Sequence, residues 1–309
     1  MPITEKQKEL RKQHLGSSDV AAILGVDPWR NAYDVWLEKT GRVEDSKETE
    51  VMYAGTMFED GILKYAEGQL GKLIRNQYRS AIGFPIAANI DAIVKESGEP
   101  VEAKTAGLFG PVTEEWGDGG TDQIPDRVII QVHVHMLCTD KDICHIPAFI
   151  GGKGFNMFMV KKDDEIMNII MDQSIEFWGY VENDCPPPNC MPSMPLIKRM
   201  KREPNKVTEI DPILIQNWEN AKASLKLAQE IEEGAKTEML AALGEAEAGT
   251  FERDGLQMTL TFFEQSRRYV DSKKLKEDYP DLYKMYEKVS VFRVPRVKKP
   301  KKDWAIPTN

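Results

Sequence analysis

The amino-acid sequence predicts an α/β fold, in which a mixed central sheet is flanked by helices, followed by a smaller C-terminal α+β module. Three observations lead to this prediction. Helical patterns fill the first 70 residues, short apolar or alternating runs follow from residue 72, and a proline-rich segment divides the chain. We therefore expect a first domain at 1–185, a proline-rich and basic linker at 186–206, and a C-terminal module with a basic tail at 207–309.

The helices of the first domain are marked by their ends. Three helical runs stop at Gly25, Gly41 and Gly71, as helix C-termini often do. The predicted helices cover residues 5–13, 18–24, 31–40 and 48–70. They precede every predicted strand.

The pattern changes after residue 71 to short runs separated by turn formers, which indicates a meander of strands. Pro125 is placed to start a helix, which we prefer although the alternation VHVHM would also fit a strand. A later amphipathic helix begins at Asp163 or Asp164, either of which can cap it. The predicted strands are 72–78, 83–89, 91–94, 100–106, 144–152 and 154–162, and the two helices are 124–138 and 163–181.

The C-terminal third begins after five prolines between residues 183 and 195, which disfavour regular structure and predict a boundary. Beyond them we expect a long helix over 211–244, two strands at 251–256 and 257–263, short helices and the basic tail.

The composition is that of an ordinary globular protein. Apolar residues make up 41% and charged residues 29% of the 309 residues, and no run approaches the roughly 20 apolar residues of a membrane helix. The N-terminus lacks the apolar core of a secretory signal, so we expect a cytoplasmic protein.

The four cysteines are expected to be free thiols, with an iron–sulfur cluster as the alternative. They are Cys138, Cys144, Cys185 and Cys190. Two of them, with His133, His135 and His145, could suggest a transition-metal site, but their spacing fits no common zinc pattern.

The net charge of −9 argues against a general nucleic-acid coat protein, because phosphate contacts are made mainly by Lys and Arg. Basic residues nevertheless gather in two clusters, for which solvated surface charge is the alternative interpretation. The clusters are Lys198, Arg199, Lys201, Arg202 and Lys206, and Arg293, Arg296, Lys298, Lys299, Lys301 and Lys302.

The pattern that carries chemistry is Asp91 followed by Glu102 and Lys104 within PVEAKTA. Residues i and i+2 of a strand share a face, so the Glu102 and Lys104 side chains would project together, with Asp91 at the end of the preceding strand. Two carboxylates and the Ala103 carbonyl are hard oxygen ligands that suit Mg²⁺, with Mn²⁺ as a substitute. The same letters would also occur at a solvated strand edge.

Glu59 adds a third carboxyl group to the pattern. It lies in GTMFEDGILKY, whose apolar residues predict partial burial, and a buried carboxylate needs a cation or a hydrogen-bond partner. The alternative is a surface glutamate beside Asp60.

In this context the chain resembles the YqaJ-type viral recombinase family, relatives of lambda exonuclease within the PD-(D/E)xK nuclease superfamily. The matching segments span residues 11–188 in the family's order. They are RKQHLGSSDVAAILG, YDVWLEKTG, GTMFEDGILKY, NIDAIV, VEAKTA, IIQVHVHM, AFIGGKGFNMF and EFWGYVENDCPPP. The resemblance implies a restriction-endonuclease-like nuclease core and metal-dependent hydrolysis of linear duplex DNA in the 5′→3′ direction.

The resemblance also assigns roles to residues. It implies that Asp91 and Glu102 hold the metal, that Lys104 is the catalytic lysine, and that Glu59 and Gln131 lie beside them in helices. It further implies a ring-shaped homo-trimer, DNA ends as substrate, and a single-strand annealing protein as partner. An endonuclease with the same residues, or a DNA-binding or loading module without activity, are the alternatives.

A second predicted site would hold a 5′-phosphate. Ser18 can cap a helix that begins at Asp19, and a helix N-terminus attracts anions through its free N–H groups. The resemblance implies that Arg11 and the serines Ser17 and Ser18 grip the phosphate, although simple capping and a solvated arginine are the plainer interpretations.

This chain departs from the family at three points. Asn89 stands where the family has Ser or Thr, His133 replaces a second glutamine, and no arginine lies between Lys104 and Arg127. The last difference puts strict dependence on a 5′-phosphate in doubt.

Overall fold

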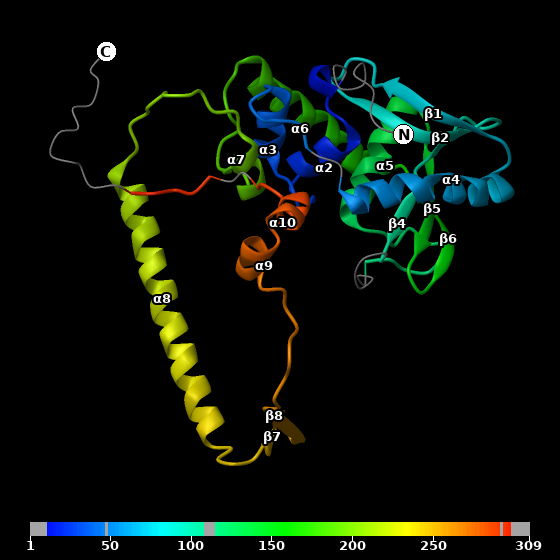
Figure 1. Ribbon diagram of the computed structural model, residues 1–309. Helices are drawn as coiled ribbons and strands as arrows, with labels where there is room; N and C mark the ends of the chain where they lie inside the picture. The colour runs from blue at the N-terminus through cyan, green and yellow to red at the C-terminus, as the bar shows by residue number, and fades with distance from the viewer. Residues whose placement is uncertain (1–10, 47–48, 108–114, 291–292, 298–309) are drawn as a thin grey trace. The chain divides into compact units, whose positions relative to one another are not determined.

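The computed structural model describes residues 11–46, 49–107, 115–290 and 293–297. The chain divides into two compact units, Met1–Arg202 and Glu203–Asn309, and each is described by itself. Figure 1 shows the helices and strands with their labels.

Of the four helices that the sequence predicts before the sheet, the structure describes three in full. They are α2 (Ser17–Ile23), α3 (Ala32–Lys39) and α4 (Glu50–Leu70). The predicted helix stops at Gly25, Gly41 and Gly71 are confirmed by positive φ angles of 75°, 69° and 82°, which glycine adopts without steric cost. Of the predicted helix 5–13, residues 11–13 are helical, and the rest lie outside the described residues.

The sheet of the first unit is mixed, so the predicted α/β class is confirmed. Its strands are β1 (Leu73–Ser80), β2 (Ala87–Val94), β3 (Pro100–Val101), β4 (Lys104–Ala106), β5 (Ile143–Ile150) and β6 (Gly154–Lys161). β1, β2 and β3 pair antiparallel in that order, β3 and β4 run parallel along β5, and β6 pairs antiparallel with β5.

The predicted strand 100–106 is wrong in its middle. Glu102 and Ala103 separate β3 from β4, because β3 pairs with both β2 and β5 whereas β4 pairs with β5 alone. The neighbouring strand β2 therefore diverges at this point, and this opening lies where the chemical pattern was found.

Helices cover both faces of the sheet. On one face, α5 (Asp126–Thr139) and α6 (Asp164–Glu182) pack against alternate residues of β5, including Ile146 and Ala148. On the other, Phe58 of α4 stacks on Phe149 of β5. The prediction of a helix after Pro125 is confirmed. Asp163 is the N-cap of α6, and its carboxylate accepts hydrogen bonds from the N–H groups of Glu165 and Ile166.

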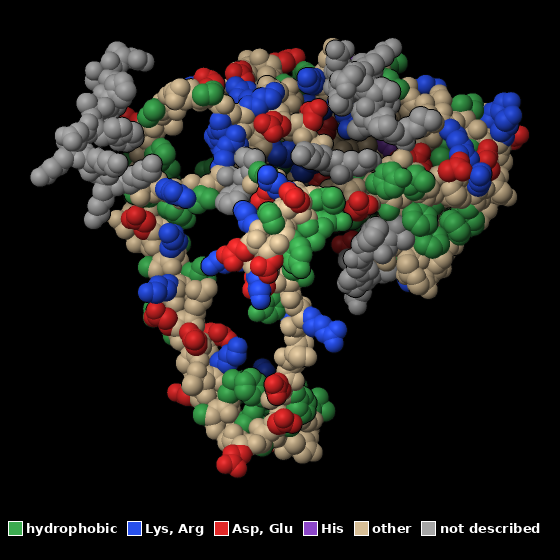
Figure 2. Space-filling view, viewed as in Figure 1, with side chains coloured by type: hydrophobic (Ala, Val, Ile, Leu, Met, Phe, Trp, Pro, Cys, Tyr) green, Lys and Arg blue, Asp and Glu red, His purple; other side chains and the backbone are tan. Residues whose placement is uncertain are grey.

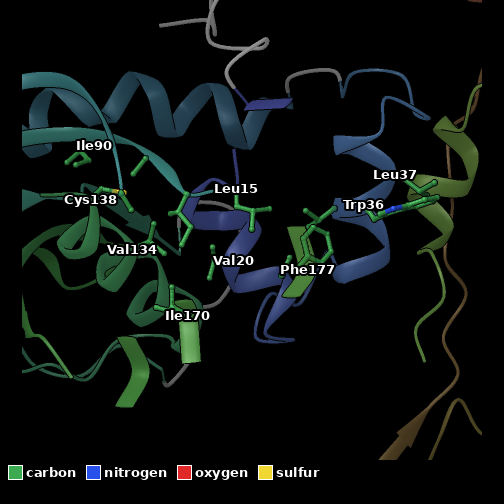
Figure 3. Close-up of a cluster of buried hydrophobic side chains, with 14 of the residues drawn as sticks. Leu15, Val20, Trp36, Leu37, Ile90, Val134, Cys138, Ile170 and Phe177 are labelled. Atoms are coloured by element: carbon green, nitrogen blue, oxygen red, sulfur yellow. The ribbon is translucent and has the colours of Figure 1, made fainter. Parts of the chain in front are cut away.

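A hydrophobic cluster joins the N-terminal helices to α5 and α6 (Figure 3). Leu15, Val20, Trp36, Leu37, Ile90, Val134, Cys138, Ile170 and Phe177 belong to it. Its residues come from segments far apart in sequence, so α2 and α3 are fixed to the body that carries the sheet.

The beginning of the segment predicted as a linker packs onto the first unit. It contains α7 (Met194–Arg199), in which Leu196 is 3% exposed and belongs to the same cluster. The Asp34 carboxylate accepts a hydrogen bond of 2.8 Å from the Ser193 N–H, and Met200 bridges to Val43. Proline near the start of a helix is tolerated, so the prolines do not prevent α7.

The second unit contains α8 (Pro212–Ala241), the hairpin β7 (Ala248–Arg253) and β8 (Leu256–Thr261), and the short helices α9 (Ser272–Asp278) and α10 (Pro280–Tyr286). Positive φ angles at Asp254 and Gly255 suit the tight hairpin turn. The predicted basic tail lies outside the described residues from Lys298 onward. Among the described residues, no helix is both long and apolar enough to span a bilayer.

If α7 is part of the first unit, removing its buried side chain must weaken that unit. We expect Leu196→Ala to lower the free energy of unfolding by about 2–5 kcal/mol, the usual range for a buried leucine. Met194→Ala is the matched control, because Met194 is 62% exposed and its loss should change stability by about 0.5 kcal/mol or less. Urea unfolding of the full chain measures both, and equal effects would show that α7 does not stabilise the unit.

Candidate active site

The candidate site lies where β2 and β3 part. Ala92 pairs with Val101, so continuing the same register would place Asp91 opposite Glu102. The strand pairing stops there, and the Asp91 Oδ2 atom instead accepts a hydrogen bond of 2.8 Å from the Ala103 N–H. The carboxylate thus satisfies a donor that the diverging strand leaves free.

Lys104 joins the site to helix α5. Its Nζ atom donates hydrogen bonds to Glu102 Oε1 at 2.6 Å and to Gln131 Oε1 at 2.7 Å. The prediction that the Glu102 and Lys104 side chains project together is confirmed, although Glu102 and Ala103 are not in a strand. Gln131 meets them because it lies on the turn of α5 that faces this opening.

The two carboxyl groups of the site have opposite pKa shifts. Burial, followed by the nearby charge of Glu102, raises the pKa of Asp91 well above its ordinary value. Burial acts in the same direction on Glu102, but the charge and hydrogen bond of Lys104 outweigh it and lower the Glu102 pKa. Without a cation, the Asp91 carboxyl group therefore keeps its proton to a higher pH than the Glu102 carboxyl group does.

Glu59 approaches the same charges from α4. Its side chain is partly buried, and burial and then the charge of Glu102 raise its pKa. Asp60 differs, since it forms exposed ion pairs with Lys64 and Arg75. The structure thus separates the two neighbours, with Glu59 in the field of the site and Asp60 at the surface.

The donor set fits a divalent cation of the Mg²⁺ type. Asp91 and Glu102 place two carboxyl groups beside Lys104, and the charge of Glu102 also acts on Glu59. Burial first, and then the nearby carboxylate charges, raise the pKa of Asp91, as expected for carboxyl groups gathered without a second cation. Hard cations prefer such oxygen ligands, and Mg²⁺ usually takes only one or two carboxylates and keeps its waters. Consistent with this, the part of the chain that the structure describes has no group of three or more acidic, His or Cys side chains arranged to enclose a metal.

His135 belongs to this site, although the sequence patterns suggested it only for a transition-metal site. It is fully buried, its Nδ1 atom lies 3.5 Å from Glu102 Oε2, and neither ring nitrogen has a hydrogen-bond partner in the described residues. Burial lowers its pKa, so the ring is neutral. The available signal was its position four residues after Gln131, which puts both on one face of α5.

The other two histidines of the considered transition-metal site have separate partners. His133 Nε2 accepts a hydrogen bond of 3.1 Å from the Asp163 N–H, and its Nδ1 atom lies 2.7 Å from the Ile129 carbonyl, to which it can donate. His145 pairs with Glu99 at 2.9 Å. His133 thus holds the start of α6 rather than a metal.

The predicted capping of α2 by Ser18 is wrong. The helix begins at Ser17 with Gly16 as its N-cap, and the Asp19 carboxylate accepts the Gly16 N–H at 2.9 Å. An acidic residue three positions after the cap can turn back in this way, which a search for serine caps overlooks. Ser18 is exposed and Ser17 is partly exposed.

Two cations lie beside this helix start that the sequence patterns did not single out. Asp19 receives Lys39 at 2.7 Å and Arg30 at 3.1 Å. Burial alone would raise the pKa of Asp19, but the two cations outweigh it and hold the pKa far below its ordinary value. Arg11 is exposed, and the predicted phosphate role of Arg11, Ser17 and Ser18 stays a prediction.

The raised pKa of Asp91 has a consequence for stability. A carboxyl group with a higher pKa in the folded state costs stability once the unfolded chain releases its proton, so the cost begins above about pH 4 and grows until the folded pKa is passed. We expect Asp91→Asn to have a higher Tm than the wild type in chelator, with a difference that increases with pH. Added Mg²⁺ should raise the Tm of the wild type and leave that of the variant unchanged.

The control is Asp60→Asn, because Lys64 and Arg75 lower the pKa of Asp60 and its loss should not stabilise the protein at any pH. Thermal unfolding at several pH values measures both variants. A lower Tm for Asp91→Asn in chelator across the whole range would contradict the assignment of an uncompensated carboxyl group.

Comparisons with known proteins agree with the motifs. Residues 7–142 match the family model of the YqaJ-like viral recombinase domain. The curated "Uncharacterized protein YqaJ" of Bacillus subtilis (strain 168) is 28% identical over 302 residues, which cover 92% of this chain and 90% of the relative.

Similar solved structures include the alkaline exonuclease LHK-Exo from Laribacter hongkongensis, with 14% identity and a TM-score of 0.46 over 59% of this chain and 94% of that one. Another is a phage-related exonuclease from Haemophilus somnus 129PT, with 12% identity and a TM-score of 0.42 over 57% and 96% of the two chains. The family resemblance that the motifs indicate is thus confirmed, because residues 7–142 match the model of the YqaJ-like viral recombinase domain.

Proposed function

We propose that this chain is a metal-dependent deoxyribonuclease that hydrolyses linear double-stranded DNA from its ends in the 5′→3′ direction. The observation that carries the proposal is the group of Asp91, Glu102 and Lys104 around the opening between β2 and β4, with Lys104 held between Glu102 and Gln131. The match to a viral recombinase domain supports a role in phage-type DNA recombination.

Asp91 and Glu102, with the Ala103 carbonyl, would hold Mg²⁺ or Mn²⁺. The chemistry that such a cation supplies is the activation of a water molecule and stabilisation of the leaving oxygen. Lys104 Nζ has a third donor beyond its two hydrogen bonds, which it can direct to a phosphate oxygen or to the attacking water. Its fixed charge offsets the negative charge that develops on the phosphate.

Glu59 and Gln131 have supporting tasks in this proposal. The Glu59 carboxylate can accept the proton that the attacking water loses, since its raised pKa makes it a better base than an ordinary surface glutamate. Gln131 fixes the position of the Lys104 ammonium group through its Oε1 atom.

The finer parts of the proposal follow from the family resemblance. They are a homo-trimer, a single-strand annealing protein that receives the exposed strand, and action in the cytoplasm of a bacterial host. Ends would be recognised by Arg11, Ser17 and Ser18, beside the cations Arg30 and Lys39.

The experiment on the active site compares linear duplex DNA in Mg²⁺ and in chelator, with closed circular DNA alongside. We expect cleavage of the linear substrate in Mg²⁺ only. Glu102→Ala should abolish cleavage and weaken metal binding, since it removes a ligand. Lys104→Ala should lower turnover by about 10²-fold or more, while metal and DNA binding persist.

Lys162→Ala is the matched control for the lysine variant, because Lys162 pairs with Asp142 at the surface and should be replaceable without loss of turnover. Wild-type cleavage by Lys104→Ala at saturating Mg²⁺ would remove the proposed active site. Equal cleavage of closed circles would instead assign an endonuclease.

The proposed end recognition predicts a substrate preference. We expect 5′-phosphorylated duplex to be degraded faster than 5′-hydroxyl duplex, because a basic side chain near free N–H groups attracts a terminal phosphate. Arg11→Ala should reduce this preference without affecting metal binding, whereas Arg79→Ala, on the exposed end of β1, should retain it. Equal degradation rates for the two ends by the wild type would refute the pocket.

A further inference from the structure

Four aromatic side chains form a continuous row on the face of the sheet that carries α4. Phe58 of α4 stacks on Phe149 of β5 with ring centroids 5.9 Å apart, and Phe149 meets Phe155 of β6 edge to face at 5.0 Å. Tyr65, two turns further along α4, stacks on Phe155 at 5.1 Å. We call these four residues the aromatic row.

The row begins beside the candidate active site. Phe58 directly precedes Glu59 in α4, and Phe149 pairs across the sheet with Thr105, the residue that follows Lys104. Lys104 points to the opposite face, towards Gln131 of α5, so the row adjoins the site through α4, where Glu59 lies in the field of Glu102.

The row ends at a cavity of about 430 Å³ that is open to solvent. Tyr65 and Phe155 line it together with Gln69, His145, Asn156 and Met157. The aromatic side chains offer flat apolar surfaces, and the Gln69 and Asn156 amides offer donors and acceptors. A nucleobase has the same combination of a flat face and a polar edge.

Helix packing alone does not account for the row. Phe58 is 44% exposed and Phe155 is 45% exposed, whereas Phe158, which points to the opposite face of the same strand, is fully buried in the core. Figure 2 shows hydrophobic side chains gathered over α4 and the neighbouring strands. Partly exposed ring faces in a line are what successive unpaired bases stack upon, and bases within a duplex are not available for this contact.

We propose that the aromatic row binds the unpaired bases of a DNA strand next to the active site and leads them to the cavity at Tyr65 and Phe155. The inference rests on the proposed function for its choice of DNA as ligand. It adds a site that acts through stacking, separate from the residues that act on the phosphate.

The test measures binding of a fluorescent thymidine oligonucleotide and an abasic oligonucleotide of equal length to the full chain, in chelator so that no cleavage occurs. We expect Phe155→Ala to weaken binding of the thymidine oligonucleotide by about 5- to 150-fold, the range for losing one stacked base, and to leave abasic binding unchanged. Phe155→Tyr keeps a ring and should keep the affinity. Ile82→Ala, at a side chain that is 97% exposed elsewhere, is the control and should bind as the wild type.

If thermal unfolding shows that Phe155→Ala does not fold, Phe58→Ala is the second variant. Its binding to the two oligonucleotides is measured and interpreted in the same way. Unchanged thymidine binding in the alanine variants, or an equal loss on both oligonucleotides, overturns the inference. A third outcome also overturns it: the wild type binds both oligonucleotides equally, and the alanine variants lose self-association. The row would then bind another copy of the chain. Cleavage of linear duplex in Mg²⁺ by the same preparations tests the proposed function separately, since stacking and hydrolysis fail independently.

Discussion

The hydrogen bond from the Ala103 N–H to the Asp91 carboxylate is the contact on which the candidate site depends. If the strands continued to pair beyond Ala92 and Val101, the backbone N–H and carbonyl groups would bond to each other. The side chains would then have no opening between the strands. By taking over one backbone donor, Asp91 lets β2 diverge while the donor stays satisfied. The opening is where Glu102 and Lys104 meet Gln131. Its position therefore follows from an interaction between a carboxylate and the backbone rather than from a loop.

The charges at the opening explain why helices on both faces are needed. Buried carboxyl groups without a partner are costly, and Glu102 is stabilised by Lys104, whose other hydrogen bond goes to α5. Glu59 reaches the same charges from α4. His135 Nδ1 lies 3.5 Å from Glu102 Oε2, and burial lowers the pKa of this histidine, which disfavours a positive charge on the ring. The site thus lies where the sheet opens and meets α4 and α5, two helices that are far apart in the sequence.

Sequence patterns were sufficient for features that depend on local chemistry. The stops at Gly25, Gly41 and Gly71, the helix after Pro125 and the cap at Asp163 each follow from a residue's own conformational preference or short-range hydrogen bonds. The break at Glu102 and Ala103 could not be predicted, because its cause is Asp91, which lies in another strand. The start of α2 was predicted wrongly for a different reason. Serine is a common N-cap, so the cap was assigned to Ser18, whereas the hydrogen bond from the Gly16 N–H to the Asp19 carboxylate places the N-cap at Gly16. The place of His135 beside Glu102 was missed because a polar residue in an apolar helix face has no pattern of its own.

Strand β5 gives the fold an unusual sensitivity to insertions and deletions. Its alternate side chains face opposite ways, with Ile146 and Ala148 in the core under α5 and Phe149 in the aromatic row under α4. The residues that pair with it, Lys104 and Thr105, alternate in the same way. Losing a single residue from β5 would exchange the two faces, so that a core position became a ring position and the reverse. Length in this strand should accordingly be held far more tightly through evolution than the identity of any one of its side chains.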